Sequence, residues 1–340
     1  MAGRYYPQKD IDTFDKFNKE LVGDLNSGKD GVIYQPVVVY KVSVYDTEVN
    51  MYGESSEGKV YKDGVLQTGI NGGGNDYLDF TAGWAVLNLG HSHDSVTEAI
   101  KDQAGKILQM SNLYYTTPQL SLAKTIVDNS DVDRVFFCNS GAEANEGAAK
   151  LARKWGKKEL NGAFEIITTL NSFHGRTQAM MAATGQPHYQ DNWRPLMPGF
   201  VNVEYNNLQQ IKDAYNDNTC AVLIEPVQGE GGIRPADLKF LQFIKKICDE
   251  NDILLFLDEV QCGFGRSGKL FSHEWAKIKP DIMAVAKGIG SGFPLGACLS
   301  TSKACVSMTK GSHGSTYGGN PLAMSVGLEV LKIVSNKNFL

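Results

Sequence analysis

From Tyr77 onward, short apolar runs alternate with longer stretches in which apolar residues recur every three or four positions. Short continuous apolar runs are typical of buried strands, and a period near 3.6 is typical of amphipathic helices. The candidate strands are Arg134–Cys138, Phe164–Thr168, Cys220–Glu225, Ile253–Asp258, Ile282–Val285 and Gly296–Ser300. The candidate helices include Ser95–Leu108 and Ala236–Glu250.

This alternation of strand and helix predicts an α/β fold. Strands that are apolar along their whole length are usually covered by helices on both faces, which implies a mainly parallel sheet. Ligands of such sheets bind at the carboxyl ends of the strands. Polar residues directly after the candidate strands are therefore the first candidates for a functional site.

The part of the chain before residue 76 has a different pattern. Pro36–Tyr45 is rich in the β-branched and aromatic residues that favour strands. Gly69–Asn75 contains four glycines, which indicates a loop or linker. Seven of the 14 tyrosines lie at or before Tyr61, whereas all six cysteines lie at or beyond Cys138. We therefore expect a β-rich N-terminal segment at 1–68, a glycine-rich linker at 69–75 and a larger domain at 76–340.

Composition and charge narrow the choice of partners. The 340 residues include 33 Lys and Arg against 38 Asp and Glu, a net charge of −5, with no long basic run. We therefore expect a small-molecule partner and neither nucleic acid nor a membrane. The cysteines form no Cys-x-x-Cys pair, which favours reduced thiols over a disulfide framework or a zinc site. The sequence has neither an apolar run of about 18 residues nor a signal-peptide pattern at its start, so we expect a cytoplasmic protein.

Two candidate strands are followed by residues that carry chemistry. Ile253–Asp258 delivers the carboxylate of Asp258 at its end, and Ile282–Val285 is followed by Lys287 in a glycine-rich turn. A lysine among small apolar residues loses its proton more readily, because desolvation disfavours the ammonium form. Taken alone, each residue is more often a surface group or a helix cap.

A possible anion site follows the strand that ends at Cys138. Ser140, Gly141 and Ala142 open a predicted helix, whose free N–H groups attract a phosphate. An ordinary capped turn has the same residues. Farther along, Phe173 offers a flat aromatic face and Arg176 a guanidinium suited to a carboxylate, although a core position and a surface ion pair are the plainer interpretations.

Together these residues indicate one cofactor. Pyridoxal phosphate needs a phosphate anchor, a stacking ring, a carboxylate at the pyridine nitrogen and an amine for a Schiff base. A nucleotide site is less favoured. The glycines at Gly72–Gly74 and Gly288–Gly292 match neither the phosphate-loop motif Gly-x-x-x-x-Gly-Lys-Ser/Thr nor the dinucleotide-binding motif Gly-x-Gly-x-x-Gly with its later acid. Metal catalysis is also not expected, since His91 and His93 have no matching ligand cluster.

The sequence from about Asp76 to Leu340 resembles the class III pyridoxal-phosphate aminotransferases of fold type I, especially the acetylornithine and ornithine aminotransferases. The matching stretches are Leu78–Gly83, Leu89–His91, Asn139–Asn145, Phe173–Thr177, Glu225–Gly232, Leu257–Gln261, Ala286–Gly288 and His313–Pro321. The resemblance implies the large domain of that fold, with a mainly parallel sheet and bound pyridoxal 5'-phosphate. Its substrates would be a small-molecule amino donor and a 2-oxo acid.

The resemblance also implies a role for each matching position. Lys287 would form the Schiff base and move the proton, and Asp258 would hold the pyridine nitrogen protonated. The remaining cofactor contacts would come from Ser140, Gly141 and Ala142 at the phosphate, Phe173 on the ring, Gln261 at the phenolic oxygen and Thr316 at the phosphate of the neighbouring subunit in a homodimer. Arg176 would grip a substrate carboxylate, and Glu230 would pair with a C-terminal arginine of the family.

Two departures from the family pattern give an alternative. The chain ends at Leu340, so we expect the small C-terminal domain, and with it the arginine partner of Glu230, to be missing. Residues 1–68 do not match the family, and Lys41–Asn50 faintly resembles a neck protein of tailed bacteriophages. The main hypothesis is transfer of an amino group from an N-acetylornithine-like or ornithine-like donor to 2-oxoglutarate, in the setting of arginine biosynthesis. The alternative is a virion structural or assembly protein fused to an incomplete, inactive aminotransferase segment.

Overall fold

The computed structural model describes residues 41–44, 61–62, 65–66, 75–79 and 81–340. The chain divides into two compact units, Met1–Phe80 and Thr81–Leu340. In the first unit, β1 (Lys41–Val44) pairs antiparallel with β4 (Asn75–Leu78). A second antiparallel pair joins β2 (Tyr61–Lys62) to β3 (Val65–Leu66).

The predicted division of the chain into three parts stays a prediction. Strand β1 lies inside the β-rich run Pro36–Tyr45, whose other residues lie outside the described part. The predicted linker at 69–75 also lies outside it, except Asn75, which is the first residue of β4.

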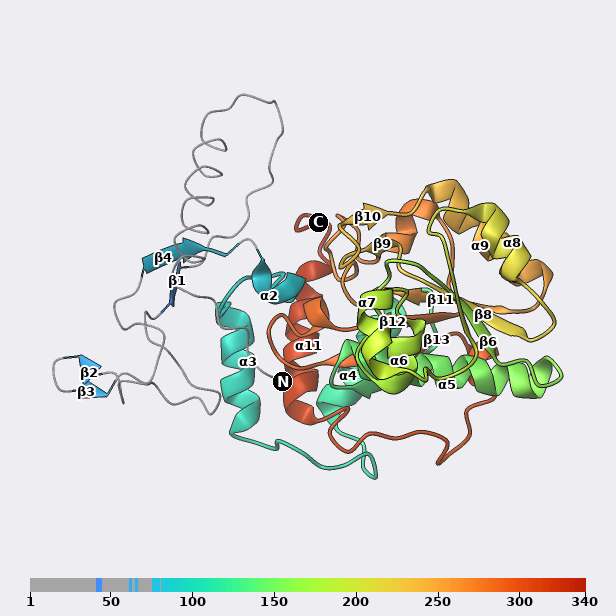
Figure 1. Ribbon diagram of the computed structural model, residues 1–340. Helices are drawn as coiled ribbons and strands as arrows, with labels where there is room; N and C mark the ends of the chain where they lie inside the picture. The colour runs from blue at the N-terminus through green and yellow to red at the C-terminus, as the bar shows by residue number, and fades with distance from the viewer. Residues whose placement is uncertain (1–40, 45–60, 63–64, 67–74, 80) are drawn as a thin grey trace. The chain divides into compact units, whose positions relative to one another are not determined.

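A seven-stranded sheet forms the centre of the second unit (Figure 1). In spatial order its strands are β5 (Arg134–Cys138), β13 (Gly296–Ser300), β12 (Ile282–Val285), β11 (Leu254–Asp258), β8 (Thr219–Ile224), β6 (Glu165–Thr169) and β7 (Phe200–Val203). The pairs from β12 to β7 are all parallel. Strand β13 runs antiparallel to both of its neighbours.

All six strands predicted from apolar runs are present, with ends that differ by at most one residue. The expected mainly parallel sheet is therefore confirmed. Strand β7 was not predicted, because Asn202 interrupts its short apolar run and only Val203 is buried in it. The direction of β13 was not predicted either, since an apolar run does not encode strand polarity.

Helices cover both faces of the sheet. The longer ones are α3 (Asp94–Ala104), α4 (Thr117–Asp128), α5 (Gly141–Glu159), α8 (Leu208–Ala214), α9 (Leu238–Glu250) and α11 (Pro321–Val334). The shorter ones are α2 (Ala82–Ala85), α6 (Gln178–Ala183), α7 (Pro187–Gln190) and α10 (Ser302–Cys305), with 3₁₀ turns η1 (Asp191–Trp193), η2 (Ser272–Ala276) and η3 (Lys287–Ile289). A small ribbon pairs β9 (Val227–Gln228) with β10 (Arg234–Pro235).

The two helices predicted from apolar periodicity are present with different ends, and α3 begins one residue earlier than expected, at Asp94. The helix expected at Ser95–Leu108 ends at Ala104, where Gly105 caps it. The helix expected at Ala236–Glu250 begins at Leu238, since Asp237 has extended backbone angles. These differences lie at helix termini, which apolar periodicity defines poorly.

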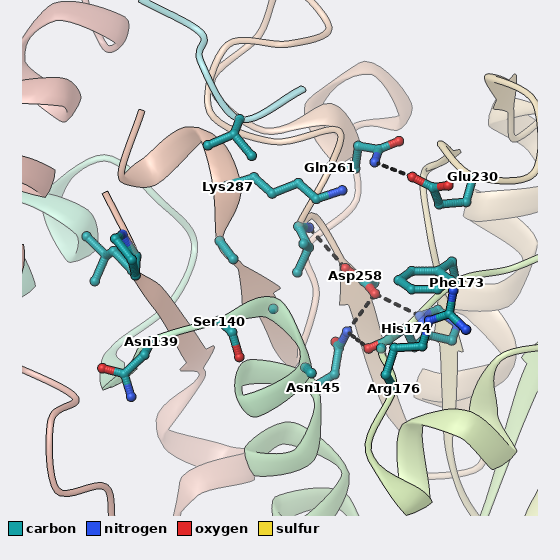
Figure 2. A pocket seen from close by; sticks show the side chains of 18 of the residues that line it. Asn139, Ser140, Asn145, Phe173, His174, Arg176, Glu230, Asp258, Gln261 and Lys287 are labelled. Atoms are coloured by element: carbon teal, nitrogen blue, oxygen red, sulfur yellow. Dashed lines mark hydrogen bonds and ion pairs between the residues drawn. The ribbon is translucent and has the colours of Figure 1, made fainter. Parts of the chain in front are cut away.

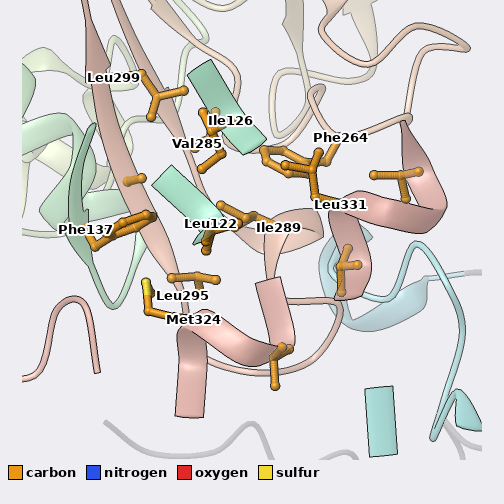
Figure 3. Close-up of a cluster of buried hydrophobic side chains, with 14 of the residues drawn as sticks. Leu122, Ile126, Phe137, Phe264, Val285, Ile289, Leu295, Leu299, Met324 and Leu331 are labelled. Atoms are coloured by element: carbon orange, nitrogen blue, oxygen red, sulfur yellow. The ribbon is translucent and has the colours of Figure 1, made fainter. Parts of the chain in front are cut away.

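Successive side chains of the strands pack alternately into hydrophobic clusters on the two faces of the sheet. Leu254 and Phe256 of β11 pack in a cluster with α5 and α6, whereas Leu255 and Leu257 pack in another with α8 and α9. A third cluster joins β12 and β13 to α4 and α11 (Figure 3). Because both faces are covered, ligands can reach this sheet only at its edges or strand ends.

Within the described residues, no helix combines the length and apolar character that crossing a bilayer requires.

Candidate active site

A pocket of about 390 Å³ lies at the carboxyl ends of the strands (Figure 2). It brings together nine of the ten site residues predicted from the sequence, namely Ser140, Gly141, Ala142, Phe173, Arg176, Glu230, Asp258, Gln261 and Lys287. Thr316 does not line it. Lys287 and Asp258, which follow or end neighbouring strands, thus share one cavity.

Asp258, at the end of β11, is held by donors from three segments. Its Oδ2 accepts the Nδ2–H of Asn145 at 2.8 Å and lies 2.7 Å from Nδ1 of His174, while Oδ1 accepts the N–H of Val260 at 3.0 Å. The side chain is 3% exposed. A carboxylate has about four acceptor positions, so one remains for a ligand donor.

His174 and Asn145 position this carboxylate, and the sequence did not single them out. Asn145 also donates to the carbonyl of His174 at 2.9 Å, which closes a triangle with Asp258. Asn145 is a fully buried polar residue in the alanine-rich face of α5 that packs on the sheet. That interruption of an apolar stripe was the available signal.

The residue after Asp258 anchors the end of β11. Glu259 is fully buried, and its carboxylate accepts the N–H of Ser272 at 2.8 Å and that of His273 at 2.9 Å. It also lies 2.9 Å from Nδ1 of His273. Because hydrogen bonds fix the side chains of both Asp258 and Glu259, Asp258 has little freedom to turn out of the pocket.

Lys287 lies two residues after the end of β12, and its side chain extends into the pocket (Figure 2). Its φ angle is 49°, in the left-handed region that is uncommon for residues with a side chain and recurs at functional sites. Desolvation lowers the pKa of Lys287, and the positive charge of Arg266 lowers it further, while Glu230, Asp258 and Glu225 raise it. Its amine has no hydrogen bond or ion pair with another described residue.

The start of α5 presents free backbone N–H groups that can bind an anion in the same pocket. Ser140 caps the helix through its hydroxyl, which accepts the N–H of Glu143, and the first intrahelical bond is donated by Ala144. The N–H groups of Gly141 and Ala142 precede that bond and belong to the unsatisfied first turn. A Cβ at position 141 would lie 2.6 Å from Cγ1 of Val260, so this close approach requires glycine.

A buried glutamate joins two walls of the pocket. Glu225, directly after β8, accepts the N–H of Phe173 at 3.0 Å and that of Gly229 at 3.2 Å. Burial, together with the charge of Asp258, raises the pKa of Glu225 to about 7, against the opposing effect of His174. The role of Glu225 was not predicted, because its contact with Phe173 joins segments 52 residues apart along the chain.

Gln261 and Glu230 contact each other across the pocket mouth. Nε2 of Gln261 donates to Oε1 of Glu230 at 3.2 Å (Figure 2). A Cβ at position 229 would lie 1.5 Å from Oε1 of Gln261, so glycine at 229 leaves room for this amide. Gln261 has further donor and acceptor capacity for a ligand.

Arg176 and Thr316 are both exposed, but their surroundings differ. Arg176 lines the pocket with its guanidinium over the rings of Phe173 and Tyr189. The backbone carbonyl of Thr316 accepts a hydrogen bond from Gln109. Thr316 thus lies on a separate surface loop of the second unit.

The arrangement defines what the pocket can do chemically. It can hold an anion at the start of α5, accept one more proton donor at Asp258, and present an amine whose pKa is lowered at Lys287. The described residues contain no cluster of His, Cys, Asp and Glu that could hold a metal ion.

Comparison with known sequences gives the same family across most of the chain. The model of the family "Aminotransferase class-III" matches residues 60–340. An acetylornithine aminotransferase of Methanocaldococcus jannaschii is 50% identical over 262 residues, which are 77% of this chain and 66% of that protein. One of Agrobacterium fabrum is 52% identical over 268 residues, 78% of this chain and 67% of that protein. The chain therefore spans about two thirds of the length of these curated relatives.

Solved structures agree with this result. The ornithine aminotransferase of Toxoplasma gondii superimposes with a TM-score of 0.75 at 27% identity, covering 97% of this chain and 75% of that one. The N-acetylornithine aminotransferase of Stenotrophomonas maltophilia gives a TM-score of 0.67 at 34% identity, with 90% and 71% covered. Sequence and structure together establish that the chain belongs to the class-III aminotransferase family.

Proposed function

We propose that the protein is a pyridoxal-phosphate-dependent aminotransferase that moves an amino group from an N-acetylornithine-like or ornithine-like donor to 2-oxoglutarate. One observation carries the proposal. The amine of Lys287, which has no partner among the described residues, and the buried carboxylate of Asp258 line one pocket together with the start of α5. The names of the relatives support the choice of donor and the setting of arginine biosynthesis.

The residues present fit the cofactor. Nε2 of His174 and Oδ1 of Asn145, in the network that holds Asp258, are buried polar atoms without a partner among the described residues, so they can make further polar contacts. The bare backbone at Gly141 leaves the first-turn N–H groups of α5 accessible to a phosphate. A related amine transaminase has been solved with pyridoxal phosphate bound, at a TM-score of 0.72 and 25% identity.

When bound, pyridoxal phosphate supplies an aldehyde for amines and a pyridine ring that withdraws electrons from the substrate carbon. Ser140, Gly141 and Ala142 would hold its phosphate, and Phe173 would stack on its ring. Asp258 would face the ring nitrogen and favour a proton there, because three hydrogen bonds hold its carboxylate in place. Gln261 would donate to the phenolic oxygen.

Lys287 would act as the base that moves a proton at the substrate carbon. A base has to be neutral to accept this proton, and desolvation favours the neutral amine by lowering the pKa of Lys287. The same amine would capture the cofactor aldehyde. Both tasks need an amine without a competing partner, which is its state among the described residues.

Substrate recognition would rely on charges at the pocket mouth. Arg176 would bind the carboxylate of the donor and of the 2-oxo acid, since a guanidinium matches a carboxylate in geometry and charge. Glu230 is expected to pair with an arginine of the family's C-terminal domain. In this structure its carboxylate accepts the amide of Gln261 instead.

A homodimer is part of the proposal. Leu113, Tyr114 and Tyr115 are 85%, 62% and 87% exposed, and Tyr317 is 65% exposed. Asn112 ties the two segments together by donating to the carbonyls of residues 315 and 318. Large exposed apolar side chains that cluster in this way mark association surfaces. Thr316 lies beside Tyr317 and would reach the phosphate of the neighbouring subunit. We place this dimer in the cytoplasm.

A donor panel tests the function. The purified protein with pyridoxal phosphate is given 2-oxoglutarate and, in turn, N-acetylornithine, ornithine, 4-aminobutyrate or a simple amine, and glutamate is measured. We expect glutamate with N-acetylornithine or ornithine and none with Lys287→Ala. Absence of glutamate with every donor, in folded protein that holds the cofactor, would overturn the proposal. The alternative of a virion protein stays a prediction, since residues 1–40 and most of 45–74 lie outside the described part.

A further inference from the structure

The guanidinium of Arg176 is held by aromatic rings. Its Cζ lies 4.1 Å from the ring centroid of Tyr189 and 5.4 Å from that of Phe173. The two rings meet edge to face, with centroids 6.1 Å apart and planes at 76°. His188 packs on Tyr189 at 4.0 Å between ring centroids.

The three carboxylates that line the pocket are engaged with other groups. Asp258 is bound by its buried network, Glu225 accepts two backbone N–H groups, and Glu230 accepts from Gln261. Arg176 has no hydrogen bond or ion pair with another described residue. Its donors are therefore not occupied by a pocket carboxylate and are available to one that enters.

A ring can hold a guanidinium without occupying those donors. The five N–H groups of arginine lie in the plane of the guanidinium, whereas stacking uses only its face. A flexible side chain that is already placed loses less entropy when it binds its ligand. Stacking on the rings of Tyr189 and Phe173 thus suits an arginine that has to bind the carboxylate of an entering substrate.

The segments that carry the two rings are themselves held in place by contacts with the rest of the fold. Tyr189 lies on α7, and the next residue, Gln190, is 6% exposed. Nε2 of Gln190 donates to the carbonyl of Thr184 at 2.7 Å, which ties α7 to the end of α6. On the other side, Gly175 approaches the start of α5 so closely that a Cβ there would lie 2.7 Å from Cβ of Ala142.

We propose that Tyr189 is a positioning residue for Arg176, whose ring holds the guanidinium at the pocket mouth and so raises the affinity for substrate carboxylates. This inference rests on the proposed function. Tyr189 acts through Arg176 and does not itself contact the reacting atoms. Its ring face, and not its hydroxyl, is the element that matters.

The test compares Tyr189→Phe, which keeps the ring, with Tyr189→Leu, which removes it. In the cofactor-loaded protein we measure kcat and KM for 2-oxoglutarate, and the Kd of glutarate, a dicarboxylate without a reacting carbonyl, by calorimetry. Tyr189→Leu should raise KM and the glutarate Kd about two- to fivefold, the effect of an exposed cation–π contact, with kcat within about twofold. Tyr189→Phe should leave KM and the glutarate Kd at their wild-type values.

A double-mutant cycle separates positioning from general damage. In Arg176→Ala protein, Tyr189→Leu should cause no further rise in the glutarate Kd, because the guanidinium that Tyr189 positions is already absent. An equal rise in both backgrounds would overturn the inference, as would an unchanged Kd in Tyr189→Leu alone. Tyr189→Met serves if the leucine variant does not fold. Wild-type protein without turnover would instead overturn the proposed function, while an active wild type with an unaffected leucine variant would overturn only this inference.

Discussion

The carboxylate of Asp258 is the most constrained group in the pocket. Its partners Asn145 and His174 lie 113 and 84 residues away along the chain and reach it from α5 and from the loop after β6. Such a network tolerates an isosteric change poorly, because an amide placed among donors leaves at least one donor facing another.

Asp258→Asn should therefore reduce kcat by about 100-fold or more, the usual effect of removing one preorganised charge from an active site. The amide also cannot stabilise a proton on the ring nitrogen as a carboxylate does. Steady-state kinetics check this prediction, with Asp249→Asn as a control, since Asp249 is exposed at the surface of α9 and pairs with Lys245 at 2.6 Å. A kcat within tenfold of wild type in the Asp258 variant would contradict the assigned role.

The lowered pKa of Lys287 gives a pH prediction. Only the neutral amine attacks an aldehyde, so the rate of cofactor capture by cofactor-free protein should rise with pH, with a midpoint below the ordinary lysine value of 10.5. Stopped-flow absorbance measures it. Arg266→Gln should move the midpoint upward, because the charge of Arg266 lowers the pKa of Lys287. A midpoint at or above 10.5 in wild type contradicts the desolvation argument.

At this scale the sequence predicted the groups that follow strands and missed those that support them. Asp258 and Lys287 were found because an apolar strand that ends in a single polar residue is a local signal. Asn145, His174 and Glu225 act through contacts between segments far apart in the sequence. No local pattern states which loops will meet, so their roles needed the fold.

At the scale of elements, helix α5 has tight contacts near both ends, with different consequences. Near its start, Gly141 leaves no room for a Cβ beside Val260, and this end faces the pocket. Near its other end, a Cβ on Gly156 would lie 2.2 Å from the carbonyl oxygen of Ala163 and 2.5 Å from Cβ of Cys220.

Alanine substitutions at the two glycines should therefore separate binding from stability. Gly156→Ala should lower the free energy of unfolding by about 1–3 kcal/mol, because backbone has to move. Gly141→Ala should weaken cofactor binding about tenfold or more, since Val260 and the helix start have to shift apart, with a smaller loss of stability. Urea unfolding and cofactor titration measure the two effects. Gly105→Ala is the control, because its nearest atom would be 3.6 Å away.

The elements also show what apolar patterns predict well. The strands between β12 and β8 were predicted within one residue because all of their residues are buried, so each apolar run is as long as its strand. Helix ends were less accurate. The apolar Ile107 and Leu108 are exposed beyond the end of α3, and Asp237 has extended backbone angles just before α9.

For the whole molecule, the proposed homodimer gives the main prediction. Leu113 is 85% exposed on the segment tied to the Thr316 loop, and burying such side chains would drive association. Leu113→Glu should convert a dimer to a monomer in light scattering after gel filtration, and lower activity at least tenfold through loss of the neighbouring Thr316. Leu208→Glu, at a position 37% exposed on α8, is the control. A fully active monomeric Leu113→Glu variant would contradict this account.

The central claim is that Lys287 is the amine that carries the cofactor. Protein incubated with pyridoxal phosphate is reduced with borohydride, digested, and examined by peptide mass spectrometry. We predict the mass of one reduced cofactor on Lys287, and its loss when the amino donor is added before reduction. A label confined to other lysines, or a label on Lys287 that no donor removes, would contradict the account.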